Sequence, residues 1–537
     1  MARAWPPRAT NGAAITRPIP ASTPGTCAMP TVSPASSIGA TVISALARAI
    51  RDADPSATAL SDGRARIHYG TLRSSLDVEM AWLHRTAGAR HAVLADNSVA
   101  WALADLALHL GEVPSVPLPE SFTGPQHLHA LDDAGVEVLL TDDPDRARRL
   151  LPGWECDGTA PASGLTRFRR RLAPDARPVL PPGTRKVTYT SGSTSTPKGA
   201  CLSGPALERV ASSLVAATRD LSIERHLCLL PLATLLENVA GLYAPLLQGA
   251  TCIIPSCRDT GMSYAGLDVA RLLGAVGGHA PNSLILVPEL LQVLVAAAER
   301  GWTVPHSLRF AAVGGARVSP ALLARADAVG VPAYEGYGLS ECASVVCLNT
   351  PGARRAGTVG RPLPHVRVRL DGSGQVHVAG NAMLGYLGDA ERAPAGEIAT
   401  GDLGAFDADG YLQLHGRAGN RFITSLGRNV SPEWIEAEVS QRLGGRPVLA
   451  FGEARPYVIA LVGAAPADVD DATVARAVED ANAVLPSYAQ VRRWARAPRP
   501  YTYVDGTLTA NGRLRRATIH ARCDATINQL YDEAIAS

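Results

Sequence analysis

The sequence predicts an α/β fold in which a large N-terminal domain of layered sheets and helices is followed by a small α+β C-terminal domain. Helical and strand patterns alternate from residue 38 onward, and this alternation is typical of largely parallel sheets covered by helices. The chain has 537 residues, more than a single hydrophobic core serves, so two or more domains are expected. A polar turn near residue 416 separates the two parts.

The elements of the N-terminal part follow from apolar periodicity. Short apolar runs are predicted as strands, at 91–95, 113–118, 136–140, 227–232, 250–255 and 283–287. Longer apolar or amphipathic runs are predicted as helices, at 100–108, 206–220, 236–247 and 288–299. Residues 153–185 are rich in Pro, Gly and Arg, and they are predicted as an irregular surface connection.

The C-terminal part has its own pattern. After a strand that ends near Leu414 and a turn at 416–421, strands are predicted at 447–451 and 457–462. A helix near 471–485 places four apolar side chains on one face, those of Val474, Val478, Ala481 and Leu485. We expect domains at 38–419 and 420–537. Residues 1–37, rich in Pro, Ala, Ser and Thr and free of acidic residues, are predicted as a disordered extension.

The composition argues against several classes of function. The formal net charge is +2, which argues against a nucleic-acid partner. No run of 18 or more apolar residues occurs, so no transmembrane segment is predicted. The nine cysteines include no C-x-x-C pair, so neither a zinc site nor a redox pair is indicated, and free thiols in a cytoplasmic protein are expected.

A loop at 190–199 is the first candidate site. A β-branched strand runs into hydroxyl residues and glycines, and Lys198 and Gly199 close the loop. Successive N–H groups and hydroxyls in such a loop form a nest for an anion, and the lysine adds a compact positive charge. The order Pro-Lys-Gly differs from that of a P-loop. A flexible Ser/Thr-rich surface linker is the alternative.

The lysine of this loop stands out against the composition. Lys and Arg together number 51, and Lys186 and Lys198 are the only lysines. A lysine that persists in a phosphate-type loop despite this bias strengthens the prediction of a phosphate site. An arginine found in place of a lysine elsewhere is, for the same reason, a weaker departure.

Four downstream segments carry further polar groups. Residues 334–341 place an aromatic, a hydroxyl and a carboxylate beyond a strand, and residues 400–403 present one carboxylate on a turn. Residues 416–417 present one guanidinium near the domain junction, and residues 508–516 form a basic turn. Each segment alone is compatible with an ordinary turn, surface charge or core residue. Their joint order is not required by folding.

In this order and at these spacings, the five segments resemble the adenylate-forming (AMP-binding) superfamily, most closely freestanding acyl-CoA synthetases (fatty acid–CoA ligases). The resemblance covers roughly residues 40–530 and implies the adenylate-forming fold with a mobile C-terminal lid. It also implies a reaction in which a carboxylic acid attacks the α-phosphorus of ATP and releases pyrophosphate. The acyl group then passes from the adenylate to the thiol of CoA or of a phosphopantetheine carrier protein.

The resemblance implies roles for individual residues. Lys198, Ser340, Glu341 and Arg513 would be catalytic, and Glu341 would bind Mg²⁺, a hard cation suited to carboxylates and phosphates. Asn420 would be the hinge between the domains. The implied nucleotide-binding residues are Thr190, Ser191, Gly192, Ser193, Thr194, Ser195, Thr196, Lys198, Gly314, Gly315, Ala316, Glu335, Gly336, Tyr337, Gly338, Ser340, Asp402 and Arg417.

Within that set, the resemblance assigns different parts of ATP to different side chains. The loop at 190–198 would hold the β- and γ-phosphates, and Ser340 would contact the α-phosphate. Tyr337 would stack on adenine, with Gly314 and its neighbours on the other side. Asp402 would accept hydrogen bonds from both ribose hydroxyls, and Arg417 would reach the same sugar.

The sequence departs from the family pattern at several positions. Arg513 stands where the family usually has a lysine, and its wider planar fork is not a conservative exchange. Ser195 replaces a usual glycine, and Thr234 stands where many members carry a histidine or an aromatic residue. A non-thiol acceptor such as an amine, or a nucleotide-binding homologue with impaired catalysis, are therefore alternative functions.

The acid pocket is expected from 234–241, 313–316 and 343–346. These residues are mostly small and apolar, with Glu237 and Asn238 as polar handles. They favour a neutral, largely apolar acyl group. Three arginines at 492, 493 and 496 are candidates for the phosphates of CoA, and a solvated basic face is the alternative.

Overall fold

The computed structural model describes residues 44–86, 88–173, 177–190, 198–263, 266–389, 396–420, 422–425, 429–464, 469–502, 505–508 and 514–532. The predicted extension at 1–37, most of the predicted phosphate loop (191–197) and Arg513 lie outside these residues. Within the described part, no helix combines the length and apolar character needed to cross a bilayer. The cysteines described there are all free, and most of them are buried.

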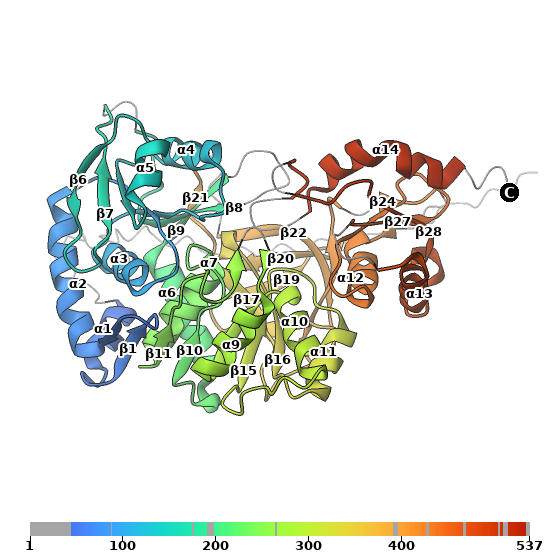
Figure 1. Ribbon diagram of the computed structural model, residues 1–537, viewed down its shortest axis with the longest axis horizontal. Coiled ribbons are helices and arrows are strands. Elements are labelled where there is room, and N and C mark those ends of the chain that lie inside the picture. The colour runs from blue at the N-terminus through green and yellow to red at the C-terminus, as the bar shows by residue number, and fades with distance from the viewer. Residues whose placement is uncertain are drawn as a thin grey trace, which may run out of the picture. The chain divides into compact units, whose positions relative to one another are not determined.

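One eight-stranded sheet contains the strand that runs into the predicted phosphate loop (Figure 1). Its strand order is β21-β9-β8-β4-β3-β5-β7-β6. The four central strands are parallel, and β9 pairs with β8 antiparallel, so that Lys198 lies opposite Thr190. The strands are β3 (His91–Leu94), β4 (Ser115–Pro117), β5 (Val138–Thr141), β6 (Glu155–Thr159), β7 (Thr166–Arg169), β8 (Thr184–Thr190), β9 (Lys198–Ser203) and β21 (Gly385–Tyr386).

Two of these strands correct the prediction of an irregular connection at 153–185. β6 and β7 form an antiparallel pair at the edge of the sheet, and β7 pairs with β5. β7 places Phe168 in the core, whereas Arg167 lies over the ring of Trp82 and binds Asp157. Because long arginine side chains cover the apolar surface here, β6 and β7 show no regular alternation of apolar and polar residues. The sequence pattern therefore does not predict these two strands.

A nine-stranded sheet forms the second layer, in the order β18-β17-β16-β15-β14-β10-β11-β1-β2. Strands β1, β11, β10, β14, β15 and β16 are parallel, and the remaining strands extend the two edges antiparallel. The strands are β1 (Thr58–Ser61), β2 (Arg66–His68), β10 (Arg225–Leu227), β11 (Thr251–Ile253), β14 (Ser283–Leu286), β15 (Phe310–Val313), β16 (Ala333–Leu339), β17 (Ser344–Leu348) and β18 (Arg361–Pro362). The strand predicted at 227–232 is shorter and starts earlier, as β10.

Helices cover both faces of this sheet, as its buried parallel strands require. Leu284 and Ala311 pack toward one group of helices, α9 (Val269–His279), α10 (Pro288–Glu299) and α11 (Pro320–Ala328). Phe310 packs toward the other, which includes α6 (Gly204–Ala217). The remaining helices of this part are α1 (Ala45–Asp52), α2 (Tyr69–Leu83), α3 (Val99–Leu110), α4 (Gly124–Asp133) and α5 (Pro144–Leu150).

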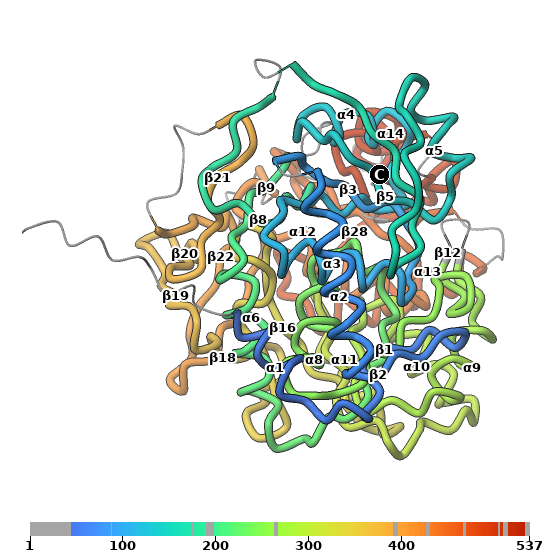
Figure 2. Tube along the Cα trace, turned by 90° about the vertical axis from the view of Figure 1, so that its left-hand side faces the viewer, coloured from blue at the N-terminus to red at the C-terminus, as the bar shows by residue number. Residues whose placement is uncertain are grey.

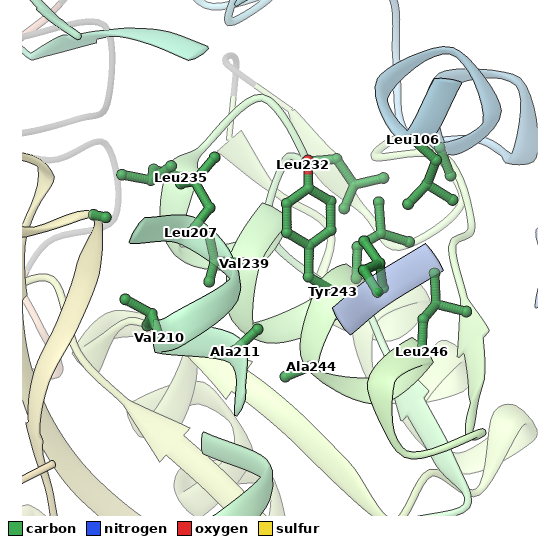
Figure 3. Packing of buried hydrophobic residues seen from close by; sticks show 14 of the residues in the cluster. Leu106, Leu207, Val210, Ala211, Leu232, Leu235, Val239, Tyr243, Ala244 and Leu246 are labelled. Atoms are coloured by element: carbon green, nitrogen blue, oxygen red, sulfur yellow. The ribbon is translucent and has the colours of Figure 1, made fainter. Parts of the chain in front are cut away.

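The helix predicted at 236–247 is not a single α-helix. It consists of α7 (Leu235–Glu237), a π-helical segment η4 (Asn238–Tyr243) and α8 (Ala244–Leu247). Figure 3 shows residues of this stretch packed against Leu207, Val210 and Ala211 of α6. Apolar periodicity locates the buried stretch but does not predict where its winding changes.

A four-stranded antiparallel sheet, β19-β20-β22-β23, presents two of the predicted site residues (Figure 2). Its strands are β19 (Arg367–Leu370), β20 (Gln375–Ala379), β22 (Glu397–Phe406) and β23 (Leu412–Arg417). The strand predicted to end near Leu414 continues to Arg417. This extension places Arg417 directly opposite Asp402 in the register.

The C-terminal module is built on the three-stranded sheet β26-β27-β28. The predicted helix face is confirmed for Val474, Val478 and Ala481, which are buried on α13, whereas the helix ends at Asn482 and the buried Leu485 lies beyond it. The module's elements are β24 (Phe422–Ile423), β25 (Asn429–Val430), α12 (Pro432–Arg442), β26 (Val448–Phe451), β27 (Val458–Val462), α13 (Asp471–Asn482), β28 (Val491–Arg496) and α14 (Arg516–Asp532). The mixed α/β organisation predicted from the sequence is thereby confirmed.

Candidate active site

Three residues predicted for the adenosine part of ATP lie in direct contact. The Tyr337 hydroxyl donates to Asp402 Oδ2 at 2.6 Å, and Arg417 Nε donates to Asp402 Oδ1 at 2.9 Å. The Asp402 side chain is 13% exposed, whereas that of Arg417 is 57% exposed. The turn predicted at 400–403 is instead part of strand β22, where the pairing with β20 is irregular; Gly401 has φ 75°, and the Asp402 N–H donates to the Thr400 hydroxyl. The three side chains form one hydrogen-bonded group at the surface of the large domain.

The charges of this group reinforce one another. Burial and the neighbouring Asp402 raise the pKa of Tyr337, so its phenol stays protonated and acts as a donor. Burial alone would lower the pKa of Arg417, but Asp402, Tyr337 and Glu341 raise it overall. Arg417 therefore carries a permanent positive charge within the influence of both carboxylates.

A second group contains the predicted phosphate lysine and the predicted metal ligand. Lys198 is exposed at the start of β9, with its Nζ 5.6 Å from the centre of the Tyr386 ring. The Tyr386 hydroxyl donates to Glu341 Oε1 at 2.6 Å. Burial and Glu341 raise the pKa of Tyr386, while Arg417 opposes the shift. The tyrosine thus lies between the lysine and the carboxylate.

Tyr386 was not predicted from the sequence. It lies on the two-residue strand β21, which pairs with β9 beside Ala200 and Cys201. The only local signal is an aromatic residue after Gly385, and a Gly-Tyr pair occurs in many turns. The pairing of β21 with a strand nearly two hundred residues earlier is a tertiary feature that periodicity does not reveal.

The backbone around Glu341 is strained. Ser340 and Glu341 begin a short 3₁₀ turn, and the two residues after Cys342 have positive φ, 61° at Ala343 and 112° at Ser344. Non-glycine residues adopt such angles rarely and at a cost, and they cluster at functional sites. At Gly338, a Cβ atom would come within 2.1 Å of the Ser344 carbonyl oxygen. Only glycine permits this approach, which fixes the turn that carries Glu341.

The predicted adenine-site turn at 314–316 is braced from inside by Glu335. The Glu335 carboxylate is buried and accepts from the Val318 N–H at 3.1 Å. Burial raises its pKa from 4.5 to about 7, whereas the bond to Val318 and the charge of Arg317 oppose the rise. Gly314 donates its N–H to the Leu286 carbonyl at the end of β14. The Glu335 carboxylate is therefore committed to the turn that follows β15.

We expect Glu335 to make stability depend on pH. The folded pKa is raised, so the folded protein holds a proton between about pH 4.5 and 7 that the unfolded chain has released. Stability therefore falls as pH rises through this window, by on the order of 3 kcal/mol at the limit. Glu335→Gln should flatten this slope in urea titrations at pH 5 and pH 8. Glu299→Gln, in an exposed pair with Arg325, is the matched control. An unchanged slope in Glu335→Gln would contradict this account.

For the remaining predicted site residues, the structure describes only some of the side chains. Of Thr190 the backbone is described, at the end of β8, and Ser191, Gly192, Ser193, Thr194, Ser195 and Thr196 lie outside the described residues. The predicted hinge residue Asn420 is exposed, and its side-chain amide donates to Glu433 Oε1 at 2.6 Å. Among the arginines considered for CoA, Arg496 is paired with Asp471 at 2.8 Å.

An apolar cavity of about 60 Å³ lies between the nine-stranded sheet and the helices α6 to α8. Along β15 it runs from Ala312 to Phe310, the first residue of the strand. Leu236 lines the cavity and also lies 3.9 Å from the position of a Cβ on Gly314. The cavity therefore begins beside the predicted nucleotide turn, which follows β15, and extends toward the residues at which β15 begins.

Three polar side chains at the cavity, those of Thr218, His226 and Ser283, are hydrogen-bonded within the protein. The Thr218 hydroxyl donates to the Leu214 carbonyl at 2.8 Å, and the side chains of His226 and Ser283 are bonded to each other at 2.8 Å. The prediction that Glu237 and Asn238 serve as polar handles is wrong. Both are fully buried, and both are bonded to other protein side chains.

Glu237 belongs to a buried cluster with His226 and Cys228, whose ligand-type atoms all lie within 4.8 Å of one another. Glu237 accepts from His226 Nε2 at 3.1 Å and from the Leu230 N–H at 3.3 Å. Burial raises the pKa values of Glu237 and Cys228. Hydrogen bonds within the protein account for this cluster, so we treat it as a support of the stretch that follows β10.

Two family models match the chain. The model described as AMP-binding enzyme covers residues 47–387, and the model described as AMP-binding enzyme C-terminal domain covers residues 420–535. The long-chain-fatty-acid–CoA ligase FadD15 of Mycobacterium bovis is 24% identical, over 83% of this chain and 88% of its own length. The feruloyl-CoA synthase of an Amycolatopsis species is 30% identical, over 73% of this chain and 81% of its own length.

A solved structure shares the fold. The anthranilate CoA ligase AuaEII, determined in complex with anthranoyl-AMP, superposes with a TM-score of 0.71 at 17% identity, covering 89% of this chain and 97% of that one. Fold and site together define an adenylate-forming enzyme. The chain belongs to the AMP-binding enzyme family. The predictions of the adenylate-forming fold and of an enzyme of the acid–thiol ligase class are thereby confirmed.

Proposed function

We propose that this enzyme activates a carboxylic acid with a neutral, largely apolar acyl group and transfers that group to the thiol of CoA. The apolar cavity beside Gly314 carries the proposal. Leu236, Ala240, Phe310 and Ala312 contribute to its wall, and the polar side chains of Thr218, His226 and Ser283 are paired within the protein. A charged or strongly hydrogen-bonding tail would lose its hydration there without compensation.

In this proposal, the two hydrogen-bonded groups divide the nucleotide between them. The Tyr337, Asp402 and Arg417 group binds adenosine, with Asp402 accepting from the ribose hydroxyls. The exposed amine of Lys198 faces the pyrophosphate leaving group. Positioning and charge neutralisation of this kind account for most catalysis of phosphoryl chemistry. The acid carboxylate, held at the mouth of the cavity, then attacks the α-phosphorus.

Glu341 fits the role of a Mg²⁺ ligand. One carboxylate oxygen accepts from Tyr386, and the side chain is only partly buried. Mg²⁺ prefers to bind through one or two carboxylates together with substrate phosphates. When bound, the cation would neutralise phosphate charge. Tyr386 would keep the carboxylate oriented toward the side on which Lys198 lies.

The structure gives less information about the molecule that accepts the acyl group than about the acid. The relatives named above are CoA ligases or synthetases, which supports CoA. A carrier-protein thiol or an amine acceptor would use the same adenylate. The lid domain at 420–537, the hinge at Asn420 and the role of Arg513 belong to the proposal, because they follow from the family resemblance.

A panel of acids in a pyrophosphate-release assay tests the substrate class. We expect acids with apolar tails to stimulate release at least tenfold more than amino acids or dicarboxylic acids. Addition of CoA should then yield the thioester, detected by mass spectrometry. Preference for a charged acid would contradict the cavity argument. ATP binding without stimulation by any acid would instead favour a catalytically impaired homologue.

A further inference from the structure

The second lysine of the chain lies in a buried polar network that the proposed reaction does not use. Lys186 and Asp105 are each 1% exposed, and Lys186 Nζ lies 2.6 Å from Asp105 Oδ1. The ammonium also donates to Asn238 Oδ1 at 2.5 Å and to the Tyr243 hydroxyl at 3.1 Å. Asp105 Oδ2 accepts from Asn238 Nδ2 at 2.8 Å and from the Tyr243 hydroxyl at 2.7 Å.

This network is complete. The ammonium has three protons and three oxygen partners, and each carboxylate oxygen of Asp105 accepts at least one bond. Buried ion pairs are weak sources of stability, because desolvation offsets the attraction, and apolar replacements are often neutral. A core position that keeps such a pair therefore calls for a reason other than stability. Arginine would be too wide for the site, which agrees with the survival of a lysine in a chain of 49 arginines and two lysines.

The geometry of η4 supplies that reason. Asn238 and Tyr243 are its first and last residues, five positions apart, and both side chains reach Lys186 and Asp105. On an α-helix, residues five apart point about 140° away from each other. A π-helix, with its i to i+5 hydrogen bonds, is wound more loosely, so the same two residues lie nearer to one face. The π winding therefore allows both side chains to meet the buried pair more directly than a regular α-helix would.

The same segment forms part of the cavity wall. Leu236, Ala240 and Ala244 line the cavity, on or next to η4. Figure 3 shows Tyr243 within the packed cluster, its hydroxyl pointing away from Ala244. Gly241 is held close to the Glu237 carboxylate, where a Cβ would come within 2.3 Å of Oε1. A change in winding would rotate Ala240 and Ala244 relative to β15 and reshape the cavity.

We propose that Lys186 and Asp105 are positioning residues which hold η4 in its π-helical winding and thereby set the shape of the acyl cavity. Lys186 lies on β8, the strand that ends at Thr190, so the pair also fixes the cavity wall to the strand that enters the predicted phosphate loop. The assignment of the cavity to the acyl group rests on the proposed function. The winding of η4 does not.

The test compares Lys186→Met/Asp105→Leu with Tyr243→Phe and with wild type. The double variant removes the reason for π winding while keeping the core filled. Tyr243→Phe removes one hydroxyl and keeps the ring. We expect the KM for the preferred acid to rise at least tenfold in the double variant and threefold to fivefold in Tyr243→Phe, with a changed order of preference among acids. The KM for ATP should stay within threefold, and Lys186→Arg should not retain the wild-type acid profile.

Hydrogen exchange gives a readout that is independent of activity. Peptides covering Asn238–Tyr243 should exchange at least tenfold faster in the double variant, with little change in α10. A folded double variant with wild-type exchange and acid profile would overturn the proposal. If the double variant does not fold, unchanged exchange and acid KM in Tyr243→Phe would overturn it. Absence of acid-dependent activity in the wild type would contradict the proposed function, and the exchange result would still decide the winding.

Discussion

Glu341→Ala is expected to lower the rate of acid-dependent pyrophosphate release by about 100- to 1000-fold, and Lys198→Ala to lower it by a similar factor. Removal of a single preorganised charge from a site of developing charge has effects of this size. Glu341 is oriented by the Tyr386 hydroxyl and sits on a turn strained at Ala343 and Ser344, so solvent cannot substitute for it at the same place. Steady-state kinetics at saturating ATP and acid measure the loss.

Three comparisons sharpen this experiment. Tyr386→Phe should lower the rate only about threefold to tenfold, since it removes one hydrogen bond and leaves the carboxylate. Raising the Mg²⁺ concentration should partly restore Glu341→Gln but not Lys198→Ala. Glu299→Gln, on the exposed end of α10, should behave as wild type. Near-normal rates in Glu341→Ala or in Lys198→Ala would contradict the assignment of the site.

Asp402→Ala is expected to raise the KM for ATP by about 10- to 100-fold. Asp402 accepts from Tyr337 and Arg417, and in the proposed site it also accepts from the ribose. Hydrogen bonds to a charged group contribute about 1.5–3 kcal/mol each, and the two donors would lose their shared acceptor. Steady-state kinetics with varied ATP, or calorimetry with AMP, measure the change.

The matched control lies on the same strand. Glu397 also belongs to β22, but it pairs with exposed Arg369 at the surface. Glu397→Gln should leave the KM for ATP within twofold, because exposed ion pairs contribute little. 2′-Deoxy-ATP should discriminate further: it should bind wild type more weakly than ATP, and Asp402→Ala should bind both equally. Retained discrimination in Asp402→Ala would place the ribose elsewhere.

Much of this site could be predicted because its residues lie in short motifs at the ends of strands. Tyr337 lies near the end of strand β16 and Glu341 directly follows it, and Asp402 and Arg417 face each other across a hairpin. Short motifs of this kind can be recognised in the sequence without knowledge of the structure. The fold then brings the strands that contain them together. The structure places Tyr337, Asp402 and Arg417 in contact and places Lys198 near Glu341 through Tyr386. Their roles remain predictions.

What could not be predicted depends on partners far along the chain. Lys186 and Asp105 are 81 positions apart, and although Asp105 interrupts the apolar run at 100–108, no local pattern predicts that the two residues pair. The π winding of η4 depends on that pair, so apolar periodicity alone predicted a regular helix. Glu237 was expected to face the acid because it interrupts an apolar run. Its actual partner, His226, lies on the preceding strand β10.

The contrast between the two lysines has a practical consequence. Lys186 is enclosed by its network, whereas Lys198 is exposed, so the chain presents a single side-chain amine to solvent. A reagent specific for primary amines would therefore modify one side chain, and that side chain lies in the candidate active site. The extent of labelling, followed with and without ATP, would report occupancy of the site without knowledge of the acid. The candidate active site thus contains one amine that such a reagent labels selectively.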